Sequence, residues 1–178
     1  MKVPLKEGWN LISLPVVPDN PIITTVMKSQ IDDNTLGTVW AYVGNPGKPK
    51  SWLFFQPGKA STLKTMNDGV GYWVYMKAND ALYVKGTVIP AGALPPSYQL
   101  DQGWNLIGFK SQPDANATKR VGQYLSSING NYDPSNVWLY NSTSGLWIRA
   151  DTDPNTGTVL HPGDAMWILM TSAATLNP

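Results

Sequence analysis

The chain contains the pentapeptide Gly-Trp-Asn-Leu-Ile twice, at residues 8–12 and 103–107. A segment repeated at a long interval indicates a repeated structural unit, and this limits the fold more than any other feature. The tryptophans repeat with it at separations of 95, 98, 95 and 94 residues: Trp9 with Trp104, Trp40 with Trp138, Trp52 with Trp147, and Trp73 with Trp167. We interpret the chain as an internal duplication.

The two repeats set the expected domain boundaries. Unit one covers residues 1–90, and unit two covers residues 100–178. Residues 91–99 between them are rich in Pro and Gly and are expected to form the junction. Because roughly 80 residues is marginal for an independent domain, we expect the two units to pack on one another as one pseudo-symmetric domain.

The composition excludes several classes of function. The chain of 178 residues has no cysteine, which removes disulfides, thiolate metal sites and cysteine nucleophiles. The net charge of +1 gives no electrostatic basis for nucleic-acid binding. No apolar run approaches the ~20 residues of a membrane-spanning helix. The 16 Gly and 15 Pro, without a collagen period, indicate many turns between short strands.

Each unit is predicted to begin with a strand and a short helix. The first strand, at 9–16, is apolar on both faces and is therefore expected to be central or well covered. Residues 117–128 of unit two show helical spacing, with Val121, Tyr124, Leu125 and Ile128 forming one stripe. The matching segment 21–31 shows it less clearly.

A hairpin and a further strand complete each unit. Loops rich in turn residues separate apolar segments at 38–43 and 51–56, and again at 137–140 and 146–150. Tryptophan-containing strands follow, apolar on both faces and so expected between layers. The predicted fold is mainly β with one short helix per repeat. It consists of two homologous β-sheet or partial-barrel units.

The order of these motifs resembles an aromatic tandem β repeat. "GWNLIS", "VW-Y", a second tryptophan strand and "GxGYW" recur in that order through most of both units. Such repeats occur in large secreted and cell-surface proteins of bacteria and archaea. Unit two departs at "GDAMW", which lacks the second Gly and the Tyr. The resemblance implies an extracellular, non-catalytic module whose partners are neighbouring domains of a parent protein.

The ends of the chain allow two interpretations. No signal-peptide pattern precedes the first repeat, which follows "MKVPL" almost at once. We expect a module cut from a longer protein, with an extracellular or cell-surface location. A native cytoplasmic or virion protein is the alternative.

The residue types needed for catalysis are sparse. His161 is the only histidine, and its counterpart in unit one is Asn67. Histidine catalysis and histidine metal sites need further partners, so we expect a turn residue here. The acidic residues lie in turn-like segments rather than in apolar strands, where burial would raise a carboxyl pKa for acid catalysis. We expect no enzyme and no cofactor.

One polar loop is a candidate calcium site. In "DTDPNTG", Asp151, Asp153 and Asn155 alternate as oxygen ligands do in calcium-binding loops. Gly157 falls one place later than an EF-hand requires, and no Glu follows at the twelfth position. A polar turn between strands is the alternative.

Two Asn-X-Thr triplets, at Asn116 and Asn141, are candidate glycosylation acceptors. They would be used only in a secreted protein of a glycosylating host. Both fall in unit two, in segments predicted to lie at the surface.

The aromatic residues suggest a ligand-binding role. A tryptophan present in both units is most simply a shared core residue, so we expect most of the eight to be buried. Aromatics found in one unit only are better ligand candidates: Phe54, Phe55, Tyr75 and Tyr132. Packing specific to one unit is the alternative interpretation.

The sequence favours a non-catalytic structural or adhesive module of a larger surface or secreted protein. A carbohydrate-binding module or lectin that uses the unit-specific aromatics is the first alternative. A virion or appendage subunit is the second. Glycans or other surface proteins are the external partners that these roles imply.

Overall fold

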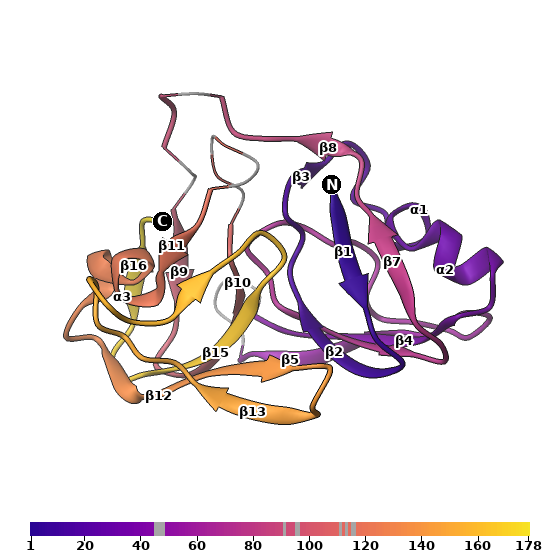
Figure 1. The fold of residues 1–178 in the computed structure, drawn as a ribbon. Helices are drawn as coiled ribbons and strands as arrows, with labels where there is room; N and C mark the ends of the chain where they lie inside the picture. The colour runs from indigo at the N-terminus through magenta and orange to yellow at the C-terminus, as the bar shows by residue number, and fades with distance from the viewer. Residues whose placement is uncertain (45–48, 91, 95–96, 111, 113, 115–116) are drawn as a thin grey trace.

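The computed structural model describes residues 1–44, 49–90, 92–94, 97–110, 112, 114 and 117–178. It confirms a mainly β fold with short helices (Figure 1). In unit one the elements are β1 (Lys2–Leu5), β2 (Gly8–Ile12), β3 (Val17–Pro18), α1 (Ile23–Val26), α2 (Lys28–Asp32), β4 (Leu36–Val43), β5 (Ser51–Phe55), β6 (Tyr72–Met76), β7 (Asp80–Tyr83) and β8 (Gly86–Thr87). The rest of the chain forms β9 (Tyr98–Leu100), β10 (Gly103–Gly108), β11 (Lys119–Arg120), α3 (Val121–Tyr124), the 3₁₀ turn η1 (Ser126–Ile128), β12 (Tyr132–Asn141), β13 (Leu146–Arg149), β14 (Val159–Leu160), β15 (Ala165–Met170) and β16 (Ala174–Leu176).

Two four-stranded antiparallel sheets form the base of the molecule, and they have the same strand order. The first is β2-β6-β4-β5, and the second is β10-β15-β12-β13. Their outer strands do not pair with each other in the described chain, so each sheet is open and neither closes into a barrel. The other strands form small pairs: β1 with β7, β9 with β16, β3 with β8, and β11 with β14.

The correspondence between the sheets extends to the register of their residues. Trp40 lies directly across from Trp73 in the first sheet, and Trp138 lies across from Trp167 in the second. The predicted hairpins are confirmed as β4–β5 and β12–β13. Equal order and equal register are what a duplication would produce; the duplication itself stays an interpretation of the sequence.

The helical segments cover the inner face of each sheet and break at matching positions. In unit one, α1 and α2 meet at Met27, and in unit two α3 and η1 meet at Leu125. The two residues have similar backbone angles, φ −97° and −90°, and both are fully buried. The predicted stripe of Val121, Tyr124 and Ile128 is also buried, which confirms that segment's amphipathic pattern.

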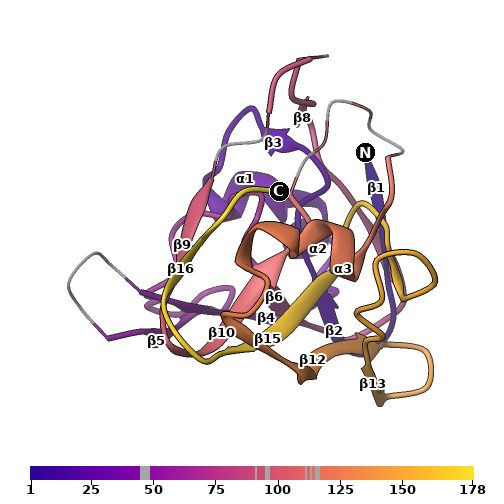
Figure 2. The same cartoon turned by 90° about the vertical axis from the view of Figure 1, so that its left-hand side faces the viewer.

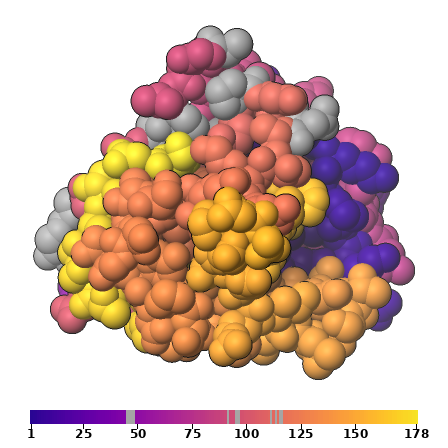
Figure 3. All heavy atoms as spheres, turned by 60° about the vertical axis from the view of Figure 1, so that its left-hand side comes forward, coloured from indigo at the N-terminus to yellow at the C-terminus, as the bar shows by residue number. Residues whose placement is uncertain are grey.

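Each unit has its own apolar core, and a smaller cluster joins them. The inner face of the first sheet packs around residues such as Val39, Val74 and Met76, and the second sheet forms an equivalent core. The joining cluster contains Leu11 and Leu106, which belong to the two copies of the pentapeptide. β2 lies beside β12, and β4 lies beside β10 (Figure 2). The space-filling view likewise shows the indigo and orange halves in direct contact (Figure 3).

The Gly and the Asn of the pentapeptide have the same structural roles in both units. Gly8 and Gly103 have φ of +91° and +90°, where a Cβ atom would cause strain. Asn10 is 1% exposed; its side-chain oxygen accepts the N–H of Lys6, and its amide donates to the carbonyl oxygens of Lys6 and Gly8. Asn105 makes the equivalent bonds in unit two. The asparagine thus closes the turn before the strand.

Of the two positions expected for the first strand, central or well covered, the structure shows the second. β2 is an outer strand of its sheet, although its residues Leu11 and Ile12 are buried. The other unit supplies the cover, because Ile12 forms an isolated antiparallel bridge with Asp164. Val70 and Ile107 form the counterpart bridge. A strand that is apolar on both faces is covered here by the contact between units rather than by neighbours in its own sheet.

Candidate functional site

None of the eight tryptophans is buried, so the prediction that most of them form the core is wrong. Four are exposed by 41 to 48% of their surface, and the other four are half-buried. The exposed four are Trp9, Trp52, Trp104 and Trp147. Because exposed tryptophans are costly to leave in water, their presence in such number is informative.

Strand alternation explains where the rings point. On β6, Tyr72, Val74 and Met76 face the core, whereas Trp73 and Tyr75 face the other side of the sheet. The same alternation places the aromatic rings of β2, β4 and β5 and those of the second sheet on this side, although on β13 the residues of the opposite side, Leu146 and Ile148, are exposed as well. The face away from the helices is therefore aromatic in both sheets, and it is open to solvent.

We call this face the aromatic surface. It comprises Trp9, Trp40, Tyr42, Trp52, Phe54, Trp73 and Tyr75 of the first sheet and Trp104, Trp138, Tyr140, Trp147 and Trp167 of the second. Eleven of the twelve are linked by ring contacts with centroids 4.9–6.3 Å apart, all of them tilted or edge-to-face. Such contacts fix ring orientation and so give a preformed surface.

Ring contacts cross between the units in matched pairs. Trp73 of unit one packs against Tyr140 and Trp147 of unit two, with centroids 4.9 and 5.5 Å apart. Its counterpart, Trp167, packs against Tyr42, the counterpart of Tyr140, at 5.5 Å. Each unit therefore presents the same patch to the other, which is the arrangement of an isologous two-fold interface.

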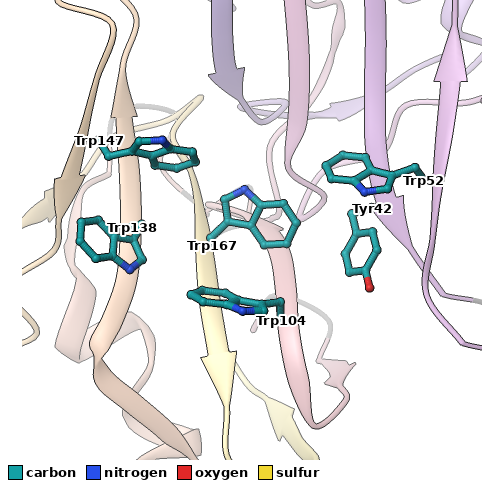
Figure 4. A pocket seen from close by; sticks show the side chains of 6 residues that line it. All are labelled: Tyr42, Trp52, Trp104, Trp138, Trp147 and Trp167. Atoms are coloured by element: carbon teal, nitrogen blue, oxygen red, sulfur yellow. The ribbon is translucent and has the colours of Figure 1, made fainter.

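The aromatic surface contains two apolar grooves, which are lined largely by equivalent residues of the two units. The Trp104 groove has a volume of about 560 Å³ and is lined by Tyr42, Trp52, Trp104, Trp138, Trp147 and Trp167 (Figure 4). The Trp9 groove has a volume of about 520 Å³ and is lined by Trp9, Trp40, Trp52, Trp73 and Tyr140. Both volumes lie in the range of small-molecule sites.

Figure 4 shows that both units contribute to the Trp104 groove. Trp138 and Trp147 stand on one side, Tyr42 and Trp52 stand on the other, and Trp167 lies between them. Trp52 also lines the Trp9 groove, so the two grooves share this residue. The grooves are therefore adjacent parts of one surface.

The indole N–H groups are largely unused within the protein. In the described part of the chain, only Trp138 donates its indole N–H, to the side-chain oxygen of Asn136 at 3.5 Å. The remaining indole N–H groups have no protein acceptor there. The aromatic surface thus offers hydrogen-bond donors beside apolar ring faces.

The buried polar groups have structural roles. Asp68 and Lys110 form an ion pair at 3.4 Å, and Lys50 and Asp101 form one at 2.9 Å; both join unit one to unit two. The hydroxyls of Tyr98 and Tyr124 are 2.9 Å apart, and burial raises the pKa of Tyr124 to about 12. These phenols stay neutral at neutral pH and hold the fold.

The structure divides the four predicted ligand-binding aromatics into two groups. Phe54 and Tyr75 lie on the aromatic surface, where they pack against Trp40 and Trp9, each with a centroid distance of 5.2 Å. Phe55 and Tyr132 are only 8 and 7% exposed. Those two side chains face the cores, so they play no part in the proposals below.

The acidic loop after β13 is organised by its own hydrogen bonds. A side-chain oxygen of Asp151 accepts the N–H of Asp153, and one of Asp153 accepts the N–H groups of Asn155 and Thr156. Such bonds are typical of a polar turn. No group of three His, Cys, Asp or Glu side chains that could hold a metal occurs among the residues the structure describes. Calcium binding stays a prediction.

The remaining candidates lie in turns. Asn141 is exposed at the end of β12, and its side-chain oxygen accepts the N–H groups of Thr143 and Ser144. Asn116 lies outside the described residues. His161 is exposed, and its backbone N–H donates to the carboxylate of Asp164 at 2.8 Å.

Comparisons with known proteins give no match to a family model, to a curated protein or to a solved structure. The resemblance to an aromatic tandem β repeat therefore stays a prediction. Among the described residues, no helix has the length and apolar character needed to cross a membrane.

Proposed function

We propose that this chain is a non-catalytic adhesive module of a larger secreted or cell-surface protein, and that it adheres by binding glycans on its aromatic surface. One observation carries the proposal: all eight tryptophans lie on one face, and none is buried. This favours the carbohydrate-binding alternative as the way in which the module adheres.

The geometry of the rings suits sugars. The C–H faces of a pyranose ring pack against the flat face of an indole or phenol. The edge-to-face contacts hold the rings in place, so little conformational entropy is lost when a ligand binds. The free indole N–H groups can donate to sugar oxygens. Apolar contact and hydrogen bonding are thus available side by side, as sugars require.

The grooves favour a glycan over a protein partner. Each has the volume of a small-molecule site, near 520–560 Å³, and each is bounded by rings on several sides. A stable protein interface buries about 800 Å² on each partner and is centred on a few aromatic anchors. A surface divided into two equivalent grooves instead matches a ligand built from similar repeating units.

A glycan array tests the proposal. The chain should bind at least one class of glycan, and Trp52→Ala should lose that binding because Trp52 lines both grooves. Tyr83→Ala is the matched control, since Tyr83 is 67% exposed but lies outside the aromatic surface. Absence of binding to every glycan would refute the proposal. Concentration-dependent dimers in light scattering would then assign the surface to a protein contact.

A further inference from the structure

The two halves of the aromatic surface differ at the position across from Trp40 and Trp138, the tryptophans that line the two grooves. In the first sheet Phe54 lies directly across from Trp40, and their rings are 5.2 Å apart. In the second sheet the residue across from Trp138, the counterpart of Trp40, is Arg149. Directly opposed residues of an antiparallel pair share a face, with Cβ atoms about 4.5–5.5 Å apart. Arg149 therefore lies on the aromatic surface beside Trp138.

Arg149 has no partner in the described part of the protein. It is exposed, and none of the ion pairs there involves it. Lys50, in contrast, is paired with Asp101. Asp151, two residues beyond Arg149, uses its carboxylate within its own loop. The guanidinium beside Trp138, a residue that lines the Trp104 groove, is thus free to bind an anion.

We infer that the Trp104 groove binds a sugar residue that carries a carboxylate, with Arg149 as the residue that recognises the charge. This inference rests on the proposed glycan binding and names its substrate class. The planar guanidinium matches a carboxylate through two parallel hydrogen bonds. The sugar ring itself stacks on Trp138 and its neighbours. The Trp9 groove has Phe54 in the equivalent place and takes an uncharged sugar.

The apolar lining strengthens the charge contact. A wholly exposed ion pair is weak because water and salt screen it. Here a sugar that fills the groove displaces water from one side of the pair, and charge-assisted hydrogen bonds gain strength as water is excluded. We expect about a tenfold preference for the acid form at low ionic strength, and a smaller preference in high salt.

The experiment compares each acidic sugar with its neutral ester. The probes are oligosaccharides of glucuronic, galacturonic and mannuronic acid, each as the free acid and as the methyl ester, printed beside neutral glycans. Wild-type protein should favour at least one acid over its ester. Arg149→Phe, which copies the residue of unit one, should abolish the preference but keep ester binding. Phe54→Arg should strengthen acid binding, because it gives the Trp9 groove a guanidinium.

The outcomes separate the inference from the proposed function. Equal binding of acids and esters, or a preference that survives in Arg149→Phe, overturns the inference; binding of neutral glycans in the same assay leaves the proposed function intact. If the wild-type protein binds no glycan at all, both the inference and the proposed function are overturned. Arg149→Gln serves if the Phe variant fails to fold, since it removes the charge and keeps a polar side chain. Circular dichroism confirms the fold of each variant.

Discussion

Ser13 and Gly108 occupy the same position in the two units, and they touch each other. A Cβ atom built on Gly108 would lie 2.4 Å from the Cβ of Ser13 and 2.7 Å from the carbonyl oxygen of Val70. Equivalent residues that meet lie on the approximate two-fold axis between the units. A side chain at Ser13 leaves no room for one at Gly108, and the sequence accordingly has Ser after "GWNLI" in unit one and Gly in unit two.

Exchanging Ser13 and Gly108 tests whether these two residues meet at the approximate two-fold axis. Gly108→Ser alone should lower the free energy of unfolding by about 1–3 kcal/mol, the usual cost of overpacking. Ser13→Gly alone should cost about 1 kcal/mol, because it removes the hydrogen bond from the serine hydroxyl to the carbonyl oxygen of Asp164. The double variant should recover part of the stability lost in Gly108→Ser, because it removes the clash with Ser13 but keeps the one with the carbonyl oxygen of Val70. Urea unfolding measures all three; a double variant less stable than Gly108→Ser would contradict the relation.

The two buried asparagines should respond differently to a charge. Asn10→Asp removes the amide donors to Lys6 and Gly8 and buries a carboxylate, so it should cost at least about 1–3 kcal/mol at pH 7. Asn105→Asp should cost less, because the ammonium group of Lys50 already contacts the Asn105 oxygen. Thermal unfolding at pH 7 measures the difference, with Asn→Ala at each site as the control. Equal losses would show that Lys50 does not compensate.

Single tryptophan variants should separate the grooves. Trp104→Ala should remove one of two glycan sites and leave the other, whereas Trp9→Ala should do the reverse. Trp52→Ala should weaken both at least tenfold, which corresponds to about 1.4 kcal/mol for each site. Calorimetry gives the number of sites and their affinities. If Trp52→Ala and Trp9→Ala have the same effect, the grooves do not act as two sites.

The acidic loop should make stability depend on pH below neutrality. Hydrogen bonds from the backbone N–H groups of Thr156 and Asn155 hold the pKa of Asp153 below its usual value. A lowered folded-state pKa stabilises the protein above the unfolded pKa, and this contribution disappears as the pH falls through the folded pKa. Asp153→Asn should therefore be less stable than wild type at pH 7, with the difference shrinking in acid. If the loop binds calcium, added calcium should raise the melting temperature of wild type alone; equal melting temperatures with and without calcium would leave the loop a polar turn.

The sequence predicted which segments form strands and hairpins better than it predicted which face of each strand is buried. The loops at 44–50 and 141–145 predicted both hairpins correctly. The helical stripe from Val121 to Ile128 was correct because amphipathic spacing depends on local geometry alone. The edge position of β2 was missed, because its cover comes from residues about 150 positions away.

The exposure of the tryptophans was missed for a different reason. A ring shared by both units fits either a shared core or a shared surface, and burial tendencies favoured the core. The alternation of residue types along the strands could have distinguished a shared surface from a shared core. Trp40 and Tyr42 are two residues apart, as are Trp73 and Tyr75, and an aliphatic residue lies between the two aromatics of each pair. Aromatics on one face and aliphatics on the other indicate that only one of the two faces is the core.

The indole N–H signals of the protein test the central claim most directly. Each of the eight tryptophans gives one such signal in a nitrogen–proton correlation spectrum, and each can be assigned by substitution. Titration with the glycan selected on the array should shift the signals of Trp52, Trp104 and Trp147 in a saturable way, because these rings line the Trp104 groove. A glycan that binds while all eight signals stay in place would contradict the account, since it would bind away from the aromatic surface.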